Sequence, residues 1–334
     1  MKILFVFTGG TIGSTRQGDY IGIDGGKPYV LLEQYRAVHG VDFLYDTITP
    51  YTALSEHNTG DTLRLLCGAV REALDGSYDG VVVTHGTDTL QYSAAALAYT
   101  LADVKIPVVL VSSNKPIEEE NANGIANLHG AIRFIREVGT AGVFVSYQNK
   151  GERVKIHRGT RLLASPAFSD GVYSVCDCIY GYFPTDGAFC KNPAYHELPN
   201  ALLPLCADNF AANCDEICHV TAYPGNPYPD LSPQVKYVLH SSYHSGTLNT
   251  ASPTAVAFFE KMRKQGVSVF LTGVAGGVSY ESTREFQALG ICPLVGLAPI
   301  AAFIKLWLLS AQSPNTPVSA KMLLSPLGGD IVLP

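Results

Sequence analysis

Short apolar runs alternate with helix-like segments along the first half of the chain. The runs typical of buried strands are residues 2–8 (KILFVFT), 80–84 (GVVVT), 106–112 and 142–147. The segments whose apolar residues recur every three or four positions, as in helices, are residues 63–74, 90–101 and 125–135. This alternation predicts a largely parallel sheet with helices on both faces.

The second half begins where this periodicity lapses. Residues 180–217 are rich in Pro, Gly, Asn and Cys without a repeating pattern, which indicates a connection between domains. A second α/β unit follows, with strands expected at residues 219–222, 237–241 and 267–272. A helix is expected to open at Ser252-Pro253, an N-cap residue followed by proline, and a late packing helix is expected over 297–309.

The sequence therefore predicts an α/β protein of two domains. Residues 1–185 are expected to form a larger N-terminal domain with a mostly parallel sheet and flanking helices, residues 186–216 a linker, and residues 217–334 a smaller C-terminal α/β domain. A length of 334 residues with 47% hydrophobic content is sufficient for two cores.

Charge and hydropathy exclude two classes of partner. The chain has 23 basic and 29 acidic residues and no run of Lys or Arg, so nucleic-acid binding as its main task is not expected. Long apolar stretches are interrupted by Gly, Pro or charge, and the N-terminus has no secretory pattern. We therefore expect no membrane association and a cytoplasmic location.

Cysteine is concentrated in one irregular stretch. Six of the 8 cysteines fall between residues 176 and 218, and His219 follows the last of them. The C-x-C and C-x-x-x-C spacings do not match the paired C-x-x-C pattern of zinc sites. Ordinary reduced thiols are expected, with no metal and no cofactor.

Two threonine-bearing turns stand directly behind predicted strands. They are residues 8–12 (TGGTI) and 85–89 (HGTDT). The carboxyl ends of parallel strands are where open α/β sheets bind ligands, so the hydroxyls of Thr11 and Thr87 are candidates for one catalytic site. A threonine hydroxyl attacks a carbonyl only if a base takes its proton, and Tyr20 or a lysine can serve. Asp88 can orient a lysine or hold a substrate ammonium, although Thr87 and Asp88 also suit a helix N-cap.

The first turn superficially matches a dinucleotide-binding fingerprint. That fingerprint requires glycine at position 8 and an apolar helix immediately afterwards, whereas residues 14–26 are polar and glycine-rich without helical period. A mobile loop fits better, and Tyr20 within it could close over a ligand and exclude water. A nucleotide-binding dehydrogenase is the alternative that this loop disfavours.

The two turns together resemble the active-site signatures of the bacterial-type L-asparaginases. The resemblance extends to residues 78–80 (YDG) and 220–225 (VTAYPG), and the lack of an export signal is similar to the cytoplasmic branch. It implies hydrolysis of L-asparagine to L-aspartate and ammonia through a threonine acyl-enzyme. It also implies a homodimer or homotetramer, in which a neighbouring subunit completes each site.

The resemblance also implies residue roles. By analogy, the catalytic residues are Thr11 as nucleophile, Tyr20, Thr87 and Asp88. The substrate-binding residues are Gly10, Ser55, Glu56, Gly86, Thr87 and Asp88. Backbone N–H groups of the two turns would form the oxyanion hole.

Three positions depart from the family pattern. Residues 158–164 (RGTRLLA) resemble a segment in which the family has a lysine at the place of Ala164, and Lys155 is a candidate for a displaced substitute. Thr247 stands where the family's neighbouring-subunit segment has asparagine. Glu56 replaces an uncharged amide of some relatives.

Three alternatives remain open beside an asparaginase. One is a glutaminase, and a related one is an amidase subunit that feeds ammonia to a tRNA-dependent amidotransferase. The latter predicts a partner-docking extension, which this sequence does not show. The third is a non-catalytic amino-acid sensor on the same fold, favoured by the missing lysine.

Overall fold

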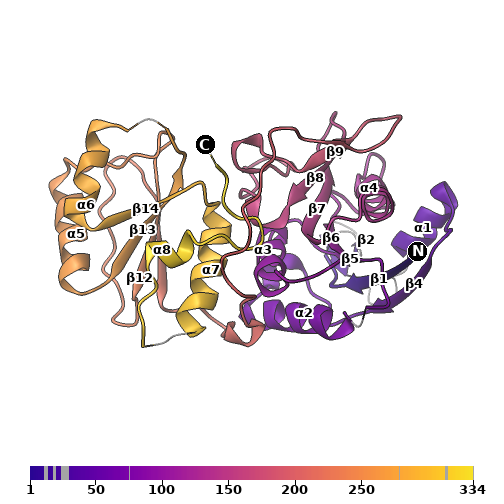
Figure 1. Cartoon of the computed structure of the whole chain (residues 1–334), viewed down its shortest axis with the longest axis horizontal. Helices are drawn as coiled ribbons and strands as arrows, with labels where there is room; N and C mark the ends of the chain where they lie inside the picture. The colour runs from indigo at the N-terminus through magenta and orange to yellow at the C-terminus, as the bar shows by residue number, and fades with distance from the viewer. Residues whose placement is uncertain are drawn as a thin grey trace.

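The computed structural model contains two main sheets that lie side by side, one in each half of the chain (Figure 1). It describes residues 1–10, 14–17, 20–23, 30–74, 76–277, 279–312 and 315–333. The N-terminal half lies on the right of Figure 1 and the C-terminal half on the left, with α7 between the sheets. The predicted two-part α/β fold is confirmed.

The larger sheet has strand order β10-β9-β8-β7-β6-β5-β1-β4. Its parallel strands are β1 (Lys2–Phe7), β4 (Leu44–Ile48), β5 (Gly80–Thr84), β6 (Pro107–Val111) and β7 (Gly142–Gln148). Its antiparallel strands, which lie together at one end of the sheet, are β8 (Val154–Arg158), β9 (Gly181–Phe183) and β10 (Cys190–Lys191). The sheet is thus parallel at its centre.

Side-chain alternation buries both faces of this sheet. On β1, Ile3 and Phe5 pack into one apolar cluster, together with helices α1 (Val30–His39) and α4 (Gly124–Glu137). Leu4 and Val6 pack into the other cluster, with the helices α2 (Gly60–Ala73) and α3 (Leu90–Thr100). The helices therefore form one layer on each face.

The smaller sheet is parallel, with order β11-β12-β13-β14. Its strands are β11 (Ile217–Val220), β12 (Tyr237–Ser241), β13 (Ser268–Val274) and β14 (Ile291–Val295). The accompanying helices are α5 (Pro253–Lys264), α6 (Phe286–Leu289), α7 (Pro299–Gln312) and α8 (Ala320–Leu323). Ser252 is the N-cap of α5 and Pro253 its first residue, as the sequence predicts.

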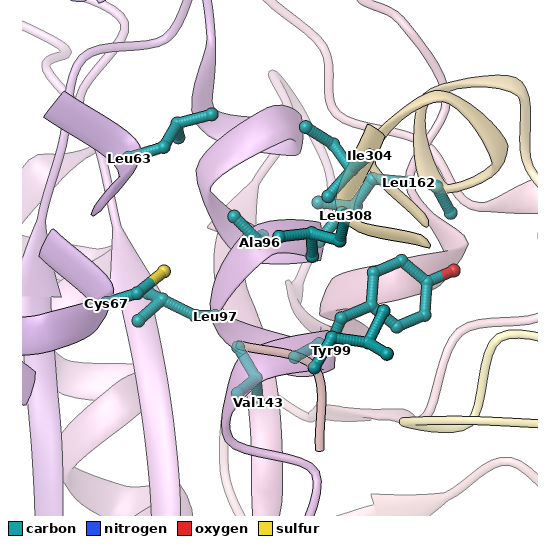
Figure 2. Packing of buried hydrophobic residues seen from close by; sticks show 14 of the residues in the cluster. Leu63, Cys67, Ala96, Leu97, Tyr99, Val143, Leu162, Ile304 and Leu308 are labelled. Atoms are coloured by element: carbon teal, nitrogen blue, oxygen red, sulfur yellow. The ribbon is translucent and has the colours of Figure 1, made fainter. Parts of the chain in front are cut away.

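Helix α7 joins the two halves by packing against α3. Figure 2 shows Ile304 and Leu308 of α7 close to Ala96 of α3 within the larger apolar cluster. The buried Lys305 Nζ lies 2.6 Å from Asp330 Oδ2 and also donates to the carbonyls of Leu323 and Ser325. This satisfied buried ion pair holds the last residues of the chain on α7.

Several elements were not predicted. A hairpin of β2 (Ser14–Gln17) and β3 (Tyr20–Ile23) occupies part of the expected loop 14–26. The expected connection at 180–217 contains β9 and β10, which extend the larger sheet. Helix α1 and the strands β4, β8 and β14 were also not predicted from the sequence. We retain 1–185, 186–216 and 217–334 as proposed domain limits.

Strand β1 marks the point at which the order of strands reverses. The chain places β4 on one side of β1, and then crosses to place β5, β6 and β7 in turn on the other side. Ligands of open α/β sheets bind outside the carboxyl ends of strands at such a reversal. The ends of β1 and β5 are therefore the expected position of a site. Among the described residues, no helix is long and apolar enough to cross a membrane.

Candidate active site

The two threonine-bearing turns leave the sheet side by side. Their strands β1 and β5 are parallel neighbours, with Phe7 paired to Thr84. Just beyond this pair, the buried Thr8 donates its hydroxyl hydrogen bond to the carbonyl of Thr84 over 2.7 Å. The Gly10 N–H then donates to the Ala53 carbonyl over 3.1 Å, so a third segment joins the turns.

Gly10 and Gly86 bring the two turns into backbone contact. A Cβ on Gly10 would lie 2.3 Å from the Gly86 nitrogen, and a Cβ on Gly86 would lie 2.4 Å from Ser55 Oγ. Gly10 also has a φ of +79°, in the region that favours glycine. Both positions therefore require glycine for the turns to approach this closely.

Ser55 connects the segment that contains Ala53 to Asp88. The Ser55 hydroxyl is 3.1 Å from Asp88 Oδ2, to which it donates, and it accepts from the Asp88 N–H at 3.2 Å. Ser55 is buried, whereas Asp88 is exposed. The predicted substrate-binding residues Ser55, Gly86 and Asp88 are thus neighbours around one carboxylate.

A buried polar network lies behind these residues. His85 Nε2 is 2.8 Å from Ser93 Oγ and 3.3 Å from Asn58 Nδ2, while its Nδ1 is 2.7 Å from the Gly86 carbonyl. Asn58 Nδ2 also donates to Thr89 Oγ1 over 2.9 Å. Burial lowers the pKa of His85 to about 4, which keeps the imidazole neutral near pH 7.

A cavity of ≈ 380 Å³ opens beside Thr87. Its lining comes from segments that follow strands of the larger sheet and from Ile300 of α7, and it includes Thr87, Asp88, Gln91, Asn114, Ala164 and Asp170. The Thr87 hydroxyl has no hydrogen-bond partner within the described ranges, and the residue is partly exposed. A hydroxyl in this position is available to a bound water or substrate.

Ala164, which aligns with the family's lysine, and Lys155, the candidate substitute for that lysine, lie in different surroundings. Ala164 lines the cavity with Asp88, as its alignment with the family segment implies. Lys155 lies on β8, and its Nζ is 2.5 Å from Glu152 Oε2. Among the described residues, the cavity wall contains no lysine.

Other predicted site residues have varied positions. Thr11 lies outside the described residues, and Tyr20 is placed only through the backbone of β3. Glu56 is exposed, without a hydrogen bond or ion pair to described residues. The N-cap of α3 is Thr89, so the expectation that Thr87 or Asp88 caps this helix is wrong.

Sequence reasoning missed Asn58, Gln91 and Asp170. Gln91 was hidden within the predicted helix 90–101, and Asp170 lies on a loop that reaches the cavity after the antiparallel strand β8. No local pattern distinguishes these residues from ordinary polar ones. In the described ranges, no group of three or more His, Cys, Asp or Glu side chains could hold a metal ion.

Comparison with known proteins places this site in a family. A family model described as "Asparaginase, N-terminal" matches residues 2–168, which is half of the chain. The chain belongs to the asparaginase family. The matched residues contain both threonine-bearing turns, Ser55 and the cavity wall as far as Pro166, so the asparaginase match includes most of the candidate site.

Relatives within the asparaginase family have two kinds of name. The chain is 27% identical over 294 residues to a glutamyl-tRNA(Gln) amidotransferase subunit of Sulfurisphaera tokodaii, which covers 83% of this chain and 64% of that protein. The chain thus spans 64% of the length of that relative. It is 46% identical over 93 residues to an L-asparaginase of Thermococcus kodakarensis, which covers 27% of this chain and 28% of the other.

A solved structure shares the asparaginase fold over almost the whole chain. L-asparaginase I of Vibrio cholerae superposes with a TM-score of 0.75 at 22% sequence identity, covering 99% of both chains. At this identity, the likeness concerns the fold alone.

Proposed function

We propose that this chain is an amidohydrolase that converts L-asparagine to L-aspartate and ammonia. The observation that supports the proposal most strongly is the backbone contact of Gly10 with Gly86, because it brings the two threonine-bearing turns together. Thr11 follows Gly10 directly in the sequence and Thr87 follows Gly86. On this basis we propose that both hydroxyls serve one site at the strand ends.

In the proposed mechanism, Thr11 is the nucleophile. Its Oγ forms a bond to the side-chain amide carbon of asparagine while Tyr20 assists removal of the hydroxyl proton. Backbone N–H groups of the two turns stabilise the oxyanion. The C–N bond then breaks, and the departing nitrogen takes a proton and leaves as ammonia. Water next to Thr87 hydrolyses the threonine ester, which releases aspartate and restores the Thr11 hydroxyl.

Substrate recognition in this proposal depends on Ser55 and Asp88. The Asp88 carboxylate binds the substrate α-ammonium group, and the Ser55 hydroxyl fixes the orientation of that carboxylate. Gly10 and Gly86 leave space for the substrate to approach the backbone. Glu56 follows Ser55 directly in the sequence and is exposed. In this proposal it adds negative charge beside the bound substrate.

The proposed enzyme is a cytoplasmic homodimer or homotetramer. The segment proposed to reach a neighbouring site is 243–249, which follows the carboxyl end of β12. In this segment the Tyr243 N–H donates to the Thr247 carbonyl over 2.9 Å, which closes a compact turn. Thr247 is the residue of this turn that we propose to contact the ligand of the neighbouring subunit.

A second candidate is an amidase that supplies ammonia within a larger assembly. Relatives named as glutamyl-tRNA(Gln) amidotransferase subunits match most of this chain at 26–28% identity, which favours this candidate. In that case the Thr11 chemistry is the same, but turnover of free asparagine is slow. A partner protein would then be needed for full activity.

Ammonia release from L-asparagine and L-glutamine, measured side by side, tests the proposal. We expect faster release from asparagine and loss of release in Thr11→Val. Calorimetry on the same Thr11→Val protein should still detect asparagine binding. Binding without release in the wild-type chain would contradict hydrolysis and identify an amino-acid sensor.

A further inference from the structure

The hydrogen bonds of the His85 ring define where its proton lies. Nδ1 of the ring is 2.7 Å from the Gly86 carbonyl oxygen, and a carbonyl oxygen only accepts hydrogen bonds. Nδ1 therefore carries a hydrogen and donates it to Gly86. Because burial lowers the pKa of His85 to about 4, the ring has a single N–H near pH 7, and Nε2 is an acceptor.

The groups around Nε2 of this ring agree with that assignment. Ser93 Oγ, at 2.8 Å, can donate its hydroxyl hydrogen, and Asn58 Nδ2, at 3.3 Å, is a donor only. The Asn58 amide is oriented independently, because Thr89 Oγ1 uses its one hydrogen on the Ser55 carbonyl and accepts from Asn58 Nδ2. The hydrogen bonds from Ser55 to Gly86 therefore have one consistent direction.

The hydrogen bond from Nδ1 of His85 orients the peptide between Gly86 and Thr87. This peptide is trans, so its carbonyl and its N–H point in opposite directions. The carbonyl faces the His85 ring, which is 1% exposed, and the Thr87 N–H therefore points away from this buried ring. Thr87 is partly exposed and lines the cavity of ≈ 380 Å³. The N–H is thus directed out of the buried polar network.

Other N–H groups of the same turn already have acceptors. The His85 N–H donates to the Val111 carbonyl over 2.9 Å. The Asp88 N–H donates to Ser55 Oγ over 3.2 Å. The Thr87 N–H, between them in sequence, donates to no backbone or side-chain acceptor among the described residues. A fixed backbone donor beside a cavity can stabilise negative charge that develops on a substrate oxygen.

We propose that His85 is a positioning residue for amide hydrolysis, which holds the Gly86–Thr87 peptide so that the Thr87 N–H donates to the oxyanion. His85 neither contacts the substrate nor exchanges a proton with it. Its Nδ1–H bond to the Gly86 carbonyl prevents this peptide from rotating while charge forms on the substrate oxygen. The inference rests on the proposed function, because it concerns the intermediate formed at the same site.

Two substitutions of His85 separate the roles of its two ring nitrogens. The amide nitrogen of His85→Asn is as many bonds from Cα as Nδ1, so it can donate to the Gly86 carbonyl. The amide of His85→Gln reaches the place of Nε2, near Ser93, and leaves Gly86 without its donor. We expect kcat for L-asparagine to fall at least about a hundredfold in His85→Gln, with KM within about threefold. In His85→Asn, kcat should remain within about tenfold of the wild-type value.

His157→Gln is the matched control for loss of a buried histidine. His157 is also 1% exposed, its Nδ1 is 2.8 Å from Ser174 Oγ, and it is not among the residues that line the cavity. Urea unfolding should show a stability loss in His157→Gln as in His85→Gln, whereas kcat should fall only in His85→Gln. Equal kcat values in His85→Asn and His85→Gln, or a change confined to KM, would overturn the positioning role.

Nitrogen NMR of the wild-type chain tests the same arrangement without turnover. The nitrogen chemical shifts of a histidine ring distinguish its two neutral tautomers and its charged form. Comparison with His85→Asn identifies the His85 signals among those of the 9 histidines. We expect the Nδ1–H tautomer near pH 7. The Nε2–H tautomer or a charged ring would overturn the inference whatever the activity, including when neither His85 variant folds.

The two proposals fail in distinguishable ways. If the wild-type chain releases no ammonia from asparagine or glutamine, amide hydrolysis is wrong, while the tautomer still shows whether His85 holds the Gly86 carbonyl. If the wild-type chain releases ammonia and His85→Gln does so at the same kcat, the proposed function stands and the positioning role of His85 is wrong.

Discussion

Gly10 and Gly86 meet so closely that a Cβ on Gly10 would lie 2.3 Å from the Gly86 nitrogen. This contact joins turns that are more than seventy residues apart in the sequence and that follow neighbouring parallel strands. Real Cβ atoms do not approach backbone atoms this closely, so the contact depends on the absence of a side chain.

Gly10→Ala is predicted to separate the two turns. The alanine Cβ would clash with the backbone of Gly86, and the φ of +79° would strain the alanine in addition. We expect loss of ammonia release by at least about a hundredfold, since a misplacement of about 1 Å is sufficient for such an effect. Gly40→Ala is the matched control, because its φ is +70° with open space around it. It should lose only about 1–2 kcal/mol of stability and keep activity; equal losses in both variants would contradict the account.

Ser55→Ala is predicted to impair substrate binding more than chemistry. The variant removes the hydroxyl that bonds both the carboxylate and the N–H of Asp88. We expect KM for asparagine to rise about tenfold, a smaller change in kcat, and a stability loss of roughly 1 kcal/mol. Steady-state kinetics and urea unfolding measure these quantities, with the exposed Ser232→Ala as control. An unchanged KM would argue against a role of Ser55 in orienting the Asp88 carboxylate that binds the substrate.

Acid is predicted to destabilise the protein through His85. Burial lowers the pKa of His85 from 6.5 to about 4, so between these values the unfolded chain binds a proton that the folded chain does not. Stability is therefore fully present above pH 6.5 and is lost as pH falls toward 4. The contribution is roughly 3 kcal/mol over this window.

Urea unfolding of His85→Gln between pH 4 and 8 tests this assignment. The stability difference between wild type and variant should shrink as pH falls, because only the wild type loses the His85 contribution. The exposed His57→Gln should follow the wild-type pH dependence. Parallel curves for wild type and His85→Gln would show that His85 does not cause the loss.

Lys305→Met is predicted to be strongly destabilising. Lys305 and Asp330 are both 0% exposed, and removal of the ammonium leaves a buried carboxylate without its counter-charge. The expected cost is about 3–5 kcal/mol in the free energy of unfolding. Lys261→Met breaks an exposed ion pair with Asp230 and should leave the free energy of unfolding nearly unchanged, because solvent screens the two charges. Similar costs for the two variants would contradict the structural role of the buried pair.

The central fold follows from hydrophobic patterning. Strands β5 and β12 match the predicted residues 80–84 and 237–241, since continuous apolar runs are typical of strands buried on both faces. The edge strand β4 was missed because its pattern is mixed and partly exposed. Strands β9 and β10 are too short to show periodicity, and only pairing along the sheet edge defines them.

The part of the candidate site that lies in short sequence motifs could be predicted. Thr87, Asp88 and Gly86 belong to a turn that the preceding strand places at the sheet end. Asp170 could not be predicted, because its position depends on long-range packing of a loop that follows β8. That Lys155 takes the place of the family's lysine stays a prediction. Its Nζ pairs with Glu152 on the same hairpin, and it is not among the described residues that line the cavity beside Thr87.

The most direct test of the central claim is mass spectrometry of the intact protein, quenched during turnover of L-asparagine. We predict a transient mass increase of one aspartyl group on the wild-type protein, located by peptide mapping to Thr11 and absent from Thr11→Val. Thr87→Val should accumulate the same adduct, because water attack is impaired. Undiminished ammonia release by Thr11→Val, or an adduct on another residue, would contradict the proposed threonine chemistry.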